Sequence, residues 1–109
     1  MRICLDTSAY SAFKRGHEGA LDVMQQADEL VLPAVVVGEL LAGFRIGTHE
    51  AINRRDLDRL LDSPRVSVAV LDADTGERYA DIVAYLRAQG RPIPTNDIWI
   101  AATAMQWGL

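Results

Sequence analysis

The chain has 109 residues, of which 50% are apolar and 24% charged, a composition that excludes a disordered segment and fits one folded domain. Its formal net charge of -4 argues against nucleic-acid binding through a broad basic surface, although a nuclease can carry positive charge as bound metal. One cysteine, Cys4, excludes an intramolecular disulfide, and no apolar run approaches the ~18 residues that cross a membrane. We therefore expect a single cytoplasmic domain over residues 1–109.

The first half of the chain predicts two strands and four helices. An apolar run over residues 2–5 predicts a strand, and helices are expected over residues 9–14 and 18–27. A second strand is expected over residues 30–32, after which Pro33 opens a helix to about Arg45 that ends near Gly47. An amphipathic helix over residues 48–62 closes at Ser63–Pro64.

The second half predicts one strand and two helices. Residues 66–71 are rich in β-branched residues and predict a third strand. Asp74 and Glu77 match a capping box for a helix that runs to Gly90. A rigid extended connection follows over residues 91–94, and Thr95 is expected to cap a last helix over residues 96–107.

The order of these elements predicts the fold class. Strands alternate with helices and are apolar on both faces, which is typical of an α/β protein whose parallel sheet is covered by helices on both sides. We expect this three-layer α/β/α arrangement. The chain stops after a helix at Gly108, where the alternation calls for a further strand, so we expect the sheet to lack a C-terminal element.

Asp6 is the first candidate for a functional acid. Open parallel sheets bind ligands beyond the carboxyl ends of their strands, and Asp6 follows the first strand directly. Two interpretations remain open. Asp6 caps the next helix, or Thr7 or Ser8 does so and leaves Asp6 free to point into the crevice.

Glu39 is the one charged residue in the apolar stretch LPAVVVGELLAG, residues 32–43. Burying an unpaired carboxylate costs several kcal/mol or raises its pKa until it takes up a proton. Glu39 must therefore face solvent, pair with a distant arginine, or bind a divalent cation. The small residues beside it on the helix would let a ligand come close.

Asp97 begins the last predicted helix, where its charge is favourable near the helix dipole by ~0.3–1 kcal/mol. The apolar remainder of that helix predicts a packed position with its polar N-terminus at a crevice. Asp72 and Asp74 are assigned to turn and capping roles. His17 and His49 are expected at the surface, and no Ser-His-Asp, Walker A or GxGxxG arrangement is present.

Three carboxylates on different elements can converge on one point. Because no histidine or cysteine belongs to this pattern, the ligand set would be all oxygen, which favours Mg2+ or Mn2+ over zinc.

The whole chain resembles the PIN-domain family, and in particular the VapC-type toxins of bacterial toxin-antitoxin pairs. The resemblance is carried by LDTSAY (residues 5–10), VVVGELLAGF (residues 35–44) and GRPIPTNDIWIAATA (residues 90–104). It implies that Asp6, Glu39 and Asp97 are the acidic metal ligands. It also implies that Thr7, Ser8 and Asn96 lie beside them and orient water, metal or phosphate.

The resemblance implies a Mg2+-dependent ribonuclease that cuts single-stranded or loop RNA, forms a homodimer and is held inactive by a VapB-like antitoxin. Four arginines over residues 45–59 would contact RNA or an acidic partner, or simply form a solvated helix face: Arg45, Arg54, Arg55 and Arg59.

One departure from the family leaves an alternative open. Related sequences continue with a strand that carries a further acidic residue and pairs with the first strand. Without it, the first strand should have an uncovered edge. The alternative function is a non-catalytic PIN-fold module that binds an antitoxin or RNA without cutting it.

Overall fold

The computed structural model describes residues 1–109. Its sheet has three parallel strands in the order β1-β2-β3, with bounds Arg2–Cys4, Glu29–Pro33 and Val66–Ala69. In the register, Ile3 lies beside Leu30, and Leu30 lies beside Val66. The predicted parallel sheet is therefore confirmed. β1 is an edge strand, and its free edge is the one that the resemblance implies.

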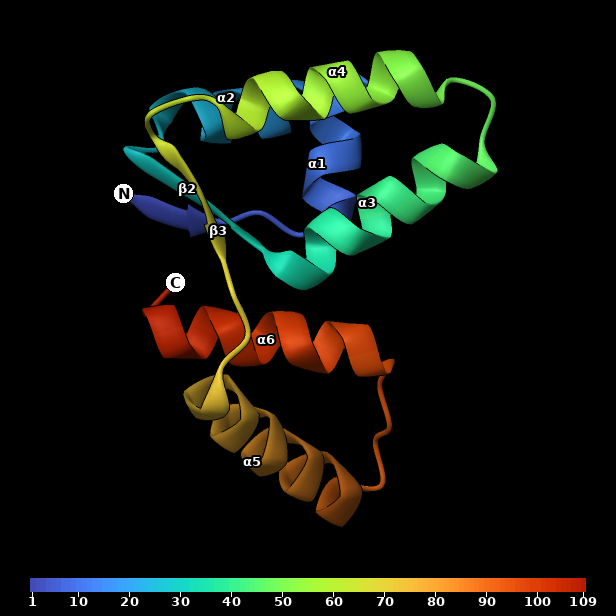
Figure 1. Ribbon diagram of the computed structural model, residues 1–109. Coiled ribbons are helices and arrows are strands. Elements are labelled where there is room, and N and C mark those ends of the chain that lie inside the picture. Colours follow the sequence, from blue (N-terminus) through green and yellow to red (C-terminus); the bar gives the residue numbers. More distant parts are fainter.

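Six helices cover the sheet, and Figure 1 shows them in two groups on its opposite sides. The first group comprises α1 (Thr7–Lys14), α2 (Glu18–Gln26), α3 (Ala34–Ile46) and α4 (Glu50–Leu61). The second group is a packed pair, α5 (Ala73–Gln89) and α6 (Thr95–Trp107), with α6 nearer the strands in the picture. The predicted three-layer α/β/α arrangement is confirmed. None of these helices combines the length and the apolar character needed to cross a bilayer.

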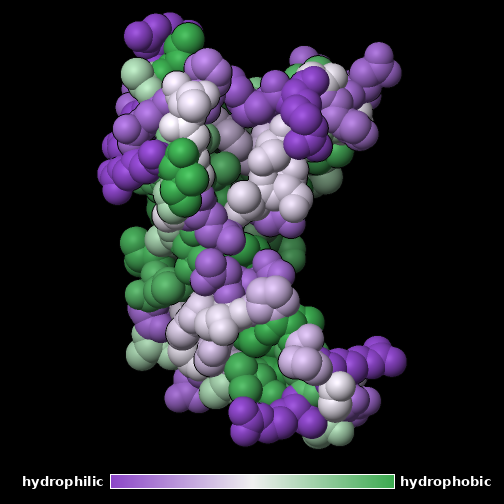
Figure 2. Space-filling model, turned by 90° about the vertical axis from the view of Figure 1, so that its right-hand side faces the viewer, coloured by the Kyte–Doolittle hydropathy of each residue, from purple (hydrophilic) through white to green (hydrophobic).

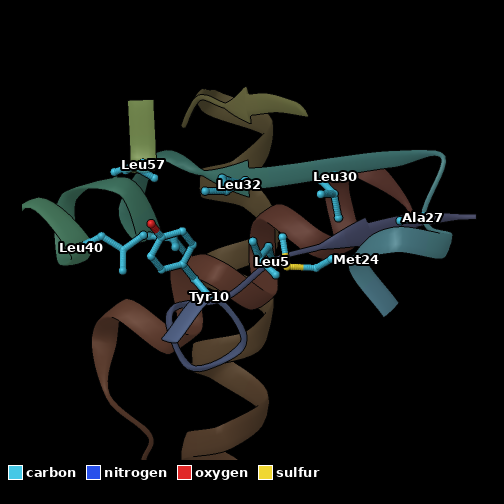
Figure 3. Packing of buried hydrophobic residues seen from close by; sticks show 9 residues of the cluster. Leu5, Tyr10, Met24, Ala27, Leu30, Leu32, Leu40 and Leu57 are labelled. Carbon is cyan, nitrogen blue, oxygen red and sulfur yellow. The ribbon is translucent and has the colours of Figure 1, made fainter. Parts of the chain in front are cut away.

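The hydrophobic core cluster lies on the α1–α4 side of the sheet (Figure 3), while Ile98 and Ala102 of α6 are buried outside it. Leu30 and Leu32 of β2 and Leu57 of α4 are completely buried. Burying each of these side chains contributes roughly 1.5–3 kcal/mol. The cluster is completed by Leu5, Tyr10, Met24, Ala27, Val36 and Leu40. From the other side, Ile100 of α6 packs against this cluster and is itself only partly buried.

The capping box of α5 differs from the prediction. Asp72, not Asp74, is the N-cap, and its Oδ1 accepts a 3.1 Å hydrogen bond from the backbone N–H of Thr75. The Thr75 hydroxyl in turn accepts from the Asp72 backbone N–H at 3.1 Å. Gln106 of α6 adds a 2.9 Å bond from its Nε2 to Asp72 Oδ1. This contact between helices favours Asp72, and it is not visible in the local sequence.

The start of α6 also differs from the prediction. Thr95 is the first helical residue rather than the cap, and Pro94 stands at the N-cap with φ -56° and ψ 143°. Proline fixes its own φ and so holds the extended conformation that a cap requires. No side chain caps the first turn, and the first helical bond runs from Ile98 N–H to Pro94 C=O.

Candidate active site

Asp6 lies where the chain passes from β1 into α1. Leu5 enters the core, so the following residue emerges at the carboxyl end of the sheet. Asp6 Oδ1 accepts a 2.8 Å hydrogen bond from the backbone N–H of Ala9 and caps α1. Of the two interpretations left open by the sequence, the capping role of Asp6 is the one observed. Asp6 Oδ2 forms no hydrogen bond with the protein and faces solvent.

Asp6 and Asp97 line the same cavity, which has a volume of about 460 Å³. Ser8 contributes a hydroxyl, while Cys4 and three residues of α6 form the remaining wall: Ile100, Ala101 and Ala104. Both aspartates are exposed to solvent. The structure therefore brings two of the three predicted acids, and one of the predicted polar neighbours, to one open cavity.

Glu39 is partly buried and has two hydrogen-bond donors, one for each carboxylate oxygen. Thr7 Oγ1 donates to Glu39 Oε1 at 2.7 Å, and Asn96 Nδ2 donates to Glu39 Oε2 at 3.4 Å. These donors are neutral, so they stabilise the carboxylate without cancelling its charge. Neither an arginine nor bulk solvent is the main partner of Glu39.

The two donors connect Glu39 to the cavity that Asp6 and Asp97 line. Thr7 follows Asp6 along the chain, and Asn96 precedes Asp97. Successive helical residues are about 100° apart around the axis, so Asn96 reaches α3 while Asp97 faces the cavity. The first turns of α1 and α6 thus each carry one cavity aspartate and one donor to Glu39.

The structure contains no group of three or more His, Cys, Asp or Glu side chains placed to hold a metal ion directly. Two carboxylates, those of Asp6 and Asp97, supply oxygen donors to the cavity. The third carboxylate, that of Glu39, is hydrogen-bonded to Thr7 and Asn96, which are the chain neighbours of those two aspartates. Mg2+ keeps several of its waters and is usually held by one or two protein carboxylates together with substrate phosphates. These residues therefore fit a partly hydrated Mg2+, and the metal stays a prediction.

Cys4 is the half-buried thiol in the wall of this cavity. Burial raises the pKa of the Cys4 thiol, and the negative charge of Asp6 raises it further. The thiol is therefore protonated at neutral pH and lacks the thiolate character of a reactive cysteine. It supplies neither a nucleophile nor a soft metal ligand to the free protein.

The four candidate arginines lie on exposed surface, and none lines the cavity of Asp6 and Asp97. Arg45 pairs with Glu50 at 3.5 Å, and Arg54 pairs with Asp58 at 3.2 Å. Arg55 and Arg59 form no ion pair. The predicted exposure of His17 and His49 is confirmed, and His17 also caps α2 through a 3.2 Å bond to its Nδ1 from Ala20 N–H.

A second cavity, which none of the sequence predictions anticipated, lies between α5, the connection after it, and α6. It has a volume of about 360 Å³. Its lining includes Arg87 and Arg91, which the sequence analysis did not treat as functional. The connection over residues 91–94 was recognised only as rigid, because a recess formed by packing two helices leaves no local pattern.

Comparisons with known proteins agree with this fold. The family model described as the PIN domain matches residues 3–109. Ribonuclease VapC5 of Mycobacterium tuberculosis (strain ATCC 25618 / H37Rv) is 29% identical over 100 residues, which span 92% of this chain and 73% of the relative.

Two solved structures illustrate the structural similarity. VapBC-1 from nontypeable Haemophilus influenzae contains a chain that is 27% identical with a TM-score of 0.84, covering 99% of this chain and 82% of its own. DNA-bound VapBC from Salmonella typhimurium gives a TM-score of 0.87 at 21% identity, covering 100% of this chain and 83% of its own. The second likeness supports the fold alone.

Proposed function

The chain belongs to the PIN domain family, and on that premise we propose that it is a Mg2+-dependent endoribonuclease toxin neutralised by a cognate VapB-like antitoxin. The similarity to ribonuclease VapC5 supports RNA phosphodiester hydrolysis as the reaction. The single observation that carries the proposal is the shared cavity of Asp6 and Asp97, with Glu39 held beside it by Thr7 and Asn96.

The chemistry of such a site follows from its charges. A bound Mg2+ would supply positive charge at the scissile phosphate, lower the pKa of a coordinated water and stabilise the leaving oxygen. Asp6 and Asp97 would hold the ion, and an acidic chain would in this way gain a local attraction for RNA. Without that positive charge, two exposed carboxylates in one cavity repel a phosphodiester.

The polar neighbours position the reacting groups. Ser8 offers a hydroxyl donor within the cavity for a phosphate oxygen. Glu39, which is held by Thr7 and Asn96, would accept a proton from the attacking water or a hydrogen bond from a water that the ion holds. Hydrolysis would join the water oxygen to phosphorus and break the bond to the leaving oxygen. One proton of the water would pass to a carboxylate, and the leaving oxygen would take up a proton from solvent.

The proposal includes the partners of the enzyme. Because the chain resembles solved VapBC complexes, we propose a VapB-like antitoxin that covers the acidic cavity, and a homodimer as the toxin's own assembly. All four arginines would contact the RNA backbone or acidic residues of the antitoxin. Arg55 and Arg59 have no ion-pair partner, whereas Arg45 and Arg54 are paired within the chain. The cytoplasm, where RNA and a reduced Cys4 thiol coexist, is the proposed compartment.

A second candidate function is a non-catalytic PIN-fold module that binds antitoxin or RNA. The observation that favours it is the absence of three side chains placed for direct metal coordination. RNA cleavage with Mg2+ or Mn2+ separates the two functions, with Asp97→Asn as the matched variant because it keeps size and removes charge. Cleavage by the parent chain and its loss in Asp97→Asn support the enzyme. If neither metal gives cleavage, or if Asp97→Asn cuts as fast as the parent, the catalytic proposal is wrong.

A further inference from the structure

The cavity between α5 and α6 has largely apolar walls. Val83 and Leu86 of α5, Ile93 of the connection and Ile98 of α6 supply them. Its volume of about 360 Å³ lies within the roughly 300–1,000 Å³ of pockets that bind small molecules. Figure 2 views the molecule from the side of this connection, and its lower half shows an apolar area bordered by hydrophilic side chains.

Charge distinguishes this cavity from an ordinary apolar recess. Its ten lining residues include Arg87 and Arg91 and no carboxylate. Both arginines are exposed, and neither belongs to any of the ion pairs in the structure. In a chain with a net charge of -4, this is a local site of positive charge. The planar donor fork of arginine matches a phosphate group.

The walls are fixed before any ligand arrives. Tyr79 lines the cavity and stacks on Trp99, with ring centroids 4.0 Å apart and planes inclined by 21°. Gly90 ends α5 in the left-handed region at φ 64°, which turns the chain into the connection. Pro92 and Pro94 restrict the connection itself. Little backbone freedom is therefore lost when the recess is filled.

The recess adjoins the candidate active site across the N-terminus of α6. Thr95 lines the recess, Asn96 donates to Glu39, and Asp97 lines the acidic cavity. All three residues belong to one helical turn, which rises only about 5.4 Å. Thr95 and Ile98 line the recess and Asp97 lines the acidic cavity, so the two lie against different faces of α6, and a strand passing over the start of this helix would reach both.

We propose that this recess is a nucleotide subsite, holding one nucleotide of single-stranded RNA beside the phosphodiester to be cut. The apolar walls receive the face of the base, and Arg87 and Arg91 pair with a phosphate of the same strand. This assignment rests on the proposed ribonuclease function. An acidic peptide would satisfy the arginines but would leave the apolar walls without a flat ring, so RNA is the better match.

Binding of RNA tests the subsite without requiring chemistry. The probe is a short fluorescent single-stranded RNA in metal-free buffer, measured by anisotropy with the whole chain. The double variant Arg87→Gln/Arg91→Gln is expected to bind about tenfold or more weakly than the parent, because two charged hydrogen bonds to phosphate are lost. The slope of log affinity against log salt should shrink by about 0.7, since the two arginines pair with one phosphate and each neutralised phosphate of a single strand contributes about 0.7.

The matched control is Arg15→Gln, which removes another exposed arginine that has no ion-pair partner, at the C-terminal end of α1. It should bind the RNA like the parent apart from the small effect of one general charge. Ile93→Ser tests the apolar wall, and Ile93 is 41% exposed, so the protein should tolerate this change. It should weaken binding of the ordinary strand and spare a strand that lacks bases.

Two outcomes overturn the subsite. The first is equal RNA affinity of the double variant and Arg15→Gln. The second is unchanged RNA affinity together with lost binding of an acidic peptide, which would make the recess a protein-docking site. Neither outcome bears on catalysis, because Asp97→Asn tests that separately in the cleavage assay. In active protein, the double variant should raise KM and leave kcat close to the parent value.

Discussion

The hydroxyl of Thr7 donates a 2.7 Å hydrogen bond to Glu39, joining the first turn of α1 to the middle of α3. The Asn96 amide reaches the other carboxylate oxygen of Glu39 from α6 at 3.4 Å. A single side chain thus connects three helices that are separate in sequence. The shorter of its two bonds is the stronger constraint on the carboxylate.

Thr7→Val should therefore lower RNA cleavage while largely preserving the fold. Valine has the shape of threonine but no hydroxyl, so Glu39 would keep only its longer bond to Asn96. The loss of a residue that orients an acidic group at a metal site typically costs about 10–100-fold in activity. Initial cleavage rates and thermal unfolding measure the two effects, and Thr7→Ser should restore the rate. A parent-like rate in Thr7→Val would show that Thr7 has no orienting role.

Asp6 has two roles that a pair of substitutions can separate. Asp6→Asn removes the charge and keeps a side chain that caps helices about as well as aspartate, whereas Asp6→Ala removes both. We expect Asp6→Asn to lose cleavage with little change in the free energy of unfolding. Asp6→Ala should lose cleavage and be destabilised by a further ~0.5–2 kcal/mol. Denaturant titration and Mg2+ binding by calorimetry provide the measurements; strong Mg2+ binding by Asp6→Asn would exclude Asp6 as a ligand.

Asp72 should contribute to the acid sensitivity of the fold. The Thr75 backbone N–H lowers the pKa of the Asp72 carboxyl below its ordinary value, with further lowering by the side chains of Gln106 and Thr75. Because the pKa is lower in the folded state, the stabilisation is present above the unfolded value of about 3.9 and is lost as pH falls through the folded value. Unfolding of the parent and Asp72→Asn between neutral pH and pH 2 should show a smaller acid-induced loss in the variant. Identical pH profiles would mean that Asp72 makes no such contribution.

Leu57 should be among the positions where truncation costs most. Its side chain is completely buried in the core, so Leu57→Ala should reduce the free energy of unfolding by about 2–5 kcal/mol. Ile52→Ala on the same helix is the control, because Ile52 is 57% exposed and its truncation should change stability by about 0.5 kcal/mol or less. Urea denaturation of both variants measures the difference. Similar losses would place Leu57 outside the core.

The sequence predicted the sheet and the six helices because apolar runs and helical periodicity are local signals. It was wrong about Asp74 and Thr95 as capping residues. Several polar residues compete at each helix start, and contacts across the fold decide between them. Asp72 was selected by Gln106, which is 34 positions away. The start of α6 was set by the fixed backbone of Pro94.

The sequence predicted which residues belong to the candidate site better than it predicted how they are arranged. Asp6 and Asp97 were placed at crevice positions, and they line one cavity. The spacing around Glu39 indicated a small apolar face but could not reveal Thr7 and Asn96 as its partners. Metal distances depend on how helices pack, and the recess beside Arg87 and Arg91 depends on the same packing. Neither is encoded in the spacing of residues along one helix.

The core cluster lies on one side of the sheet, and this position affects which part of the molecule opens first. Asp6 is anchored to that core through Leu5, while Asp97 belongs to the helix pair on the other side, which reaches the core cluster through the partly buried Ile100. Segments with less buried apolar contact open at lower free energy than the rest of a protein. The acidic cavity thus lies between the α1–α4 part of the molecule and the α5–α6 pair. Opening of that helix pair would separate Asp97 from Asp6 and disable the site while the α1–α4 part stayed folded.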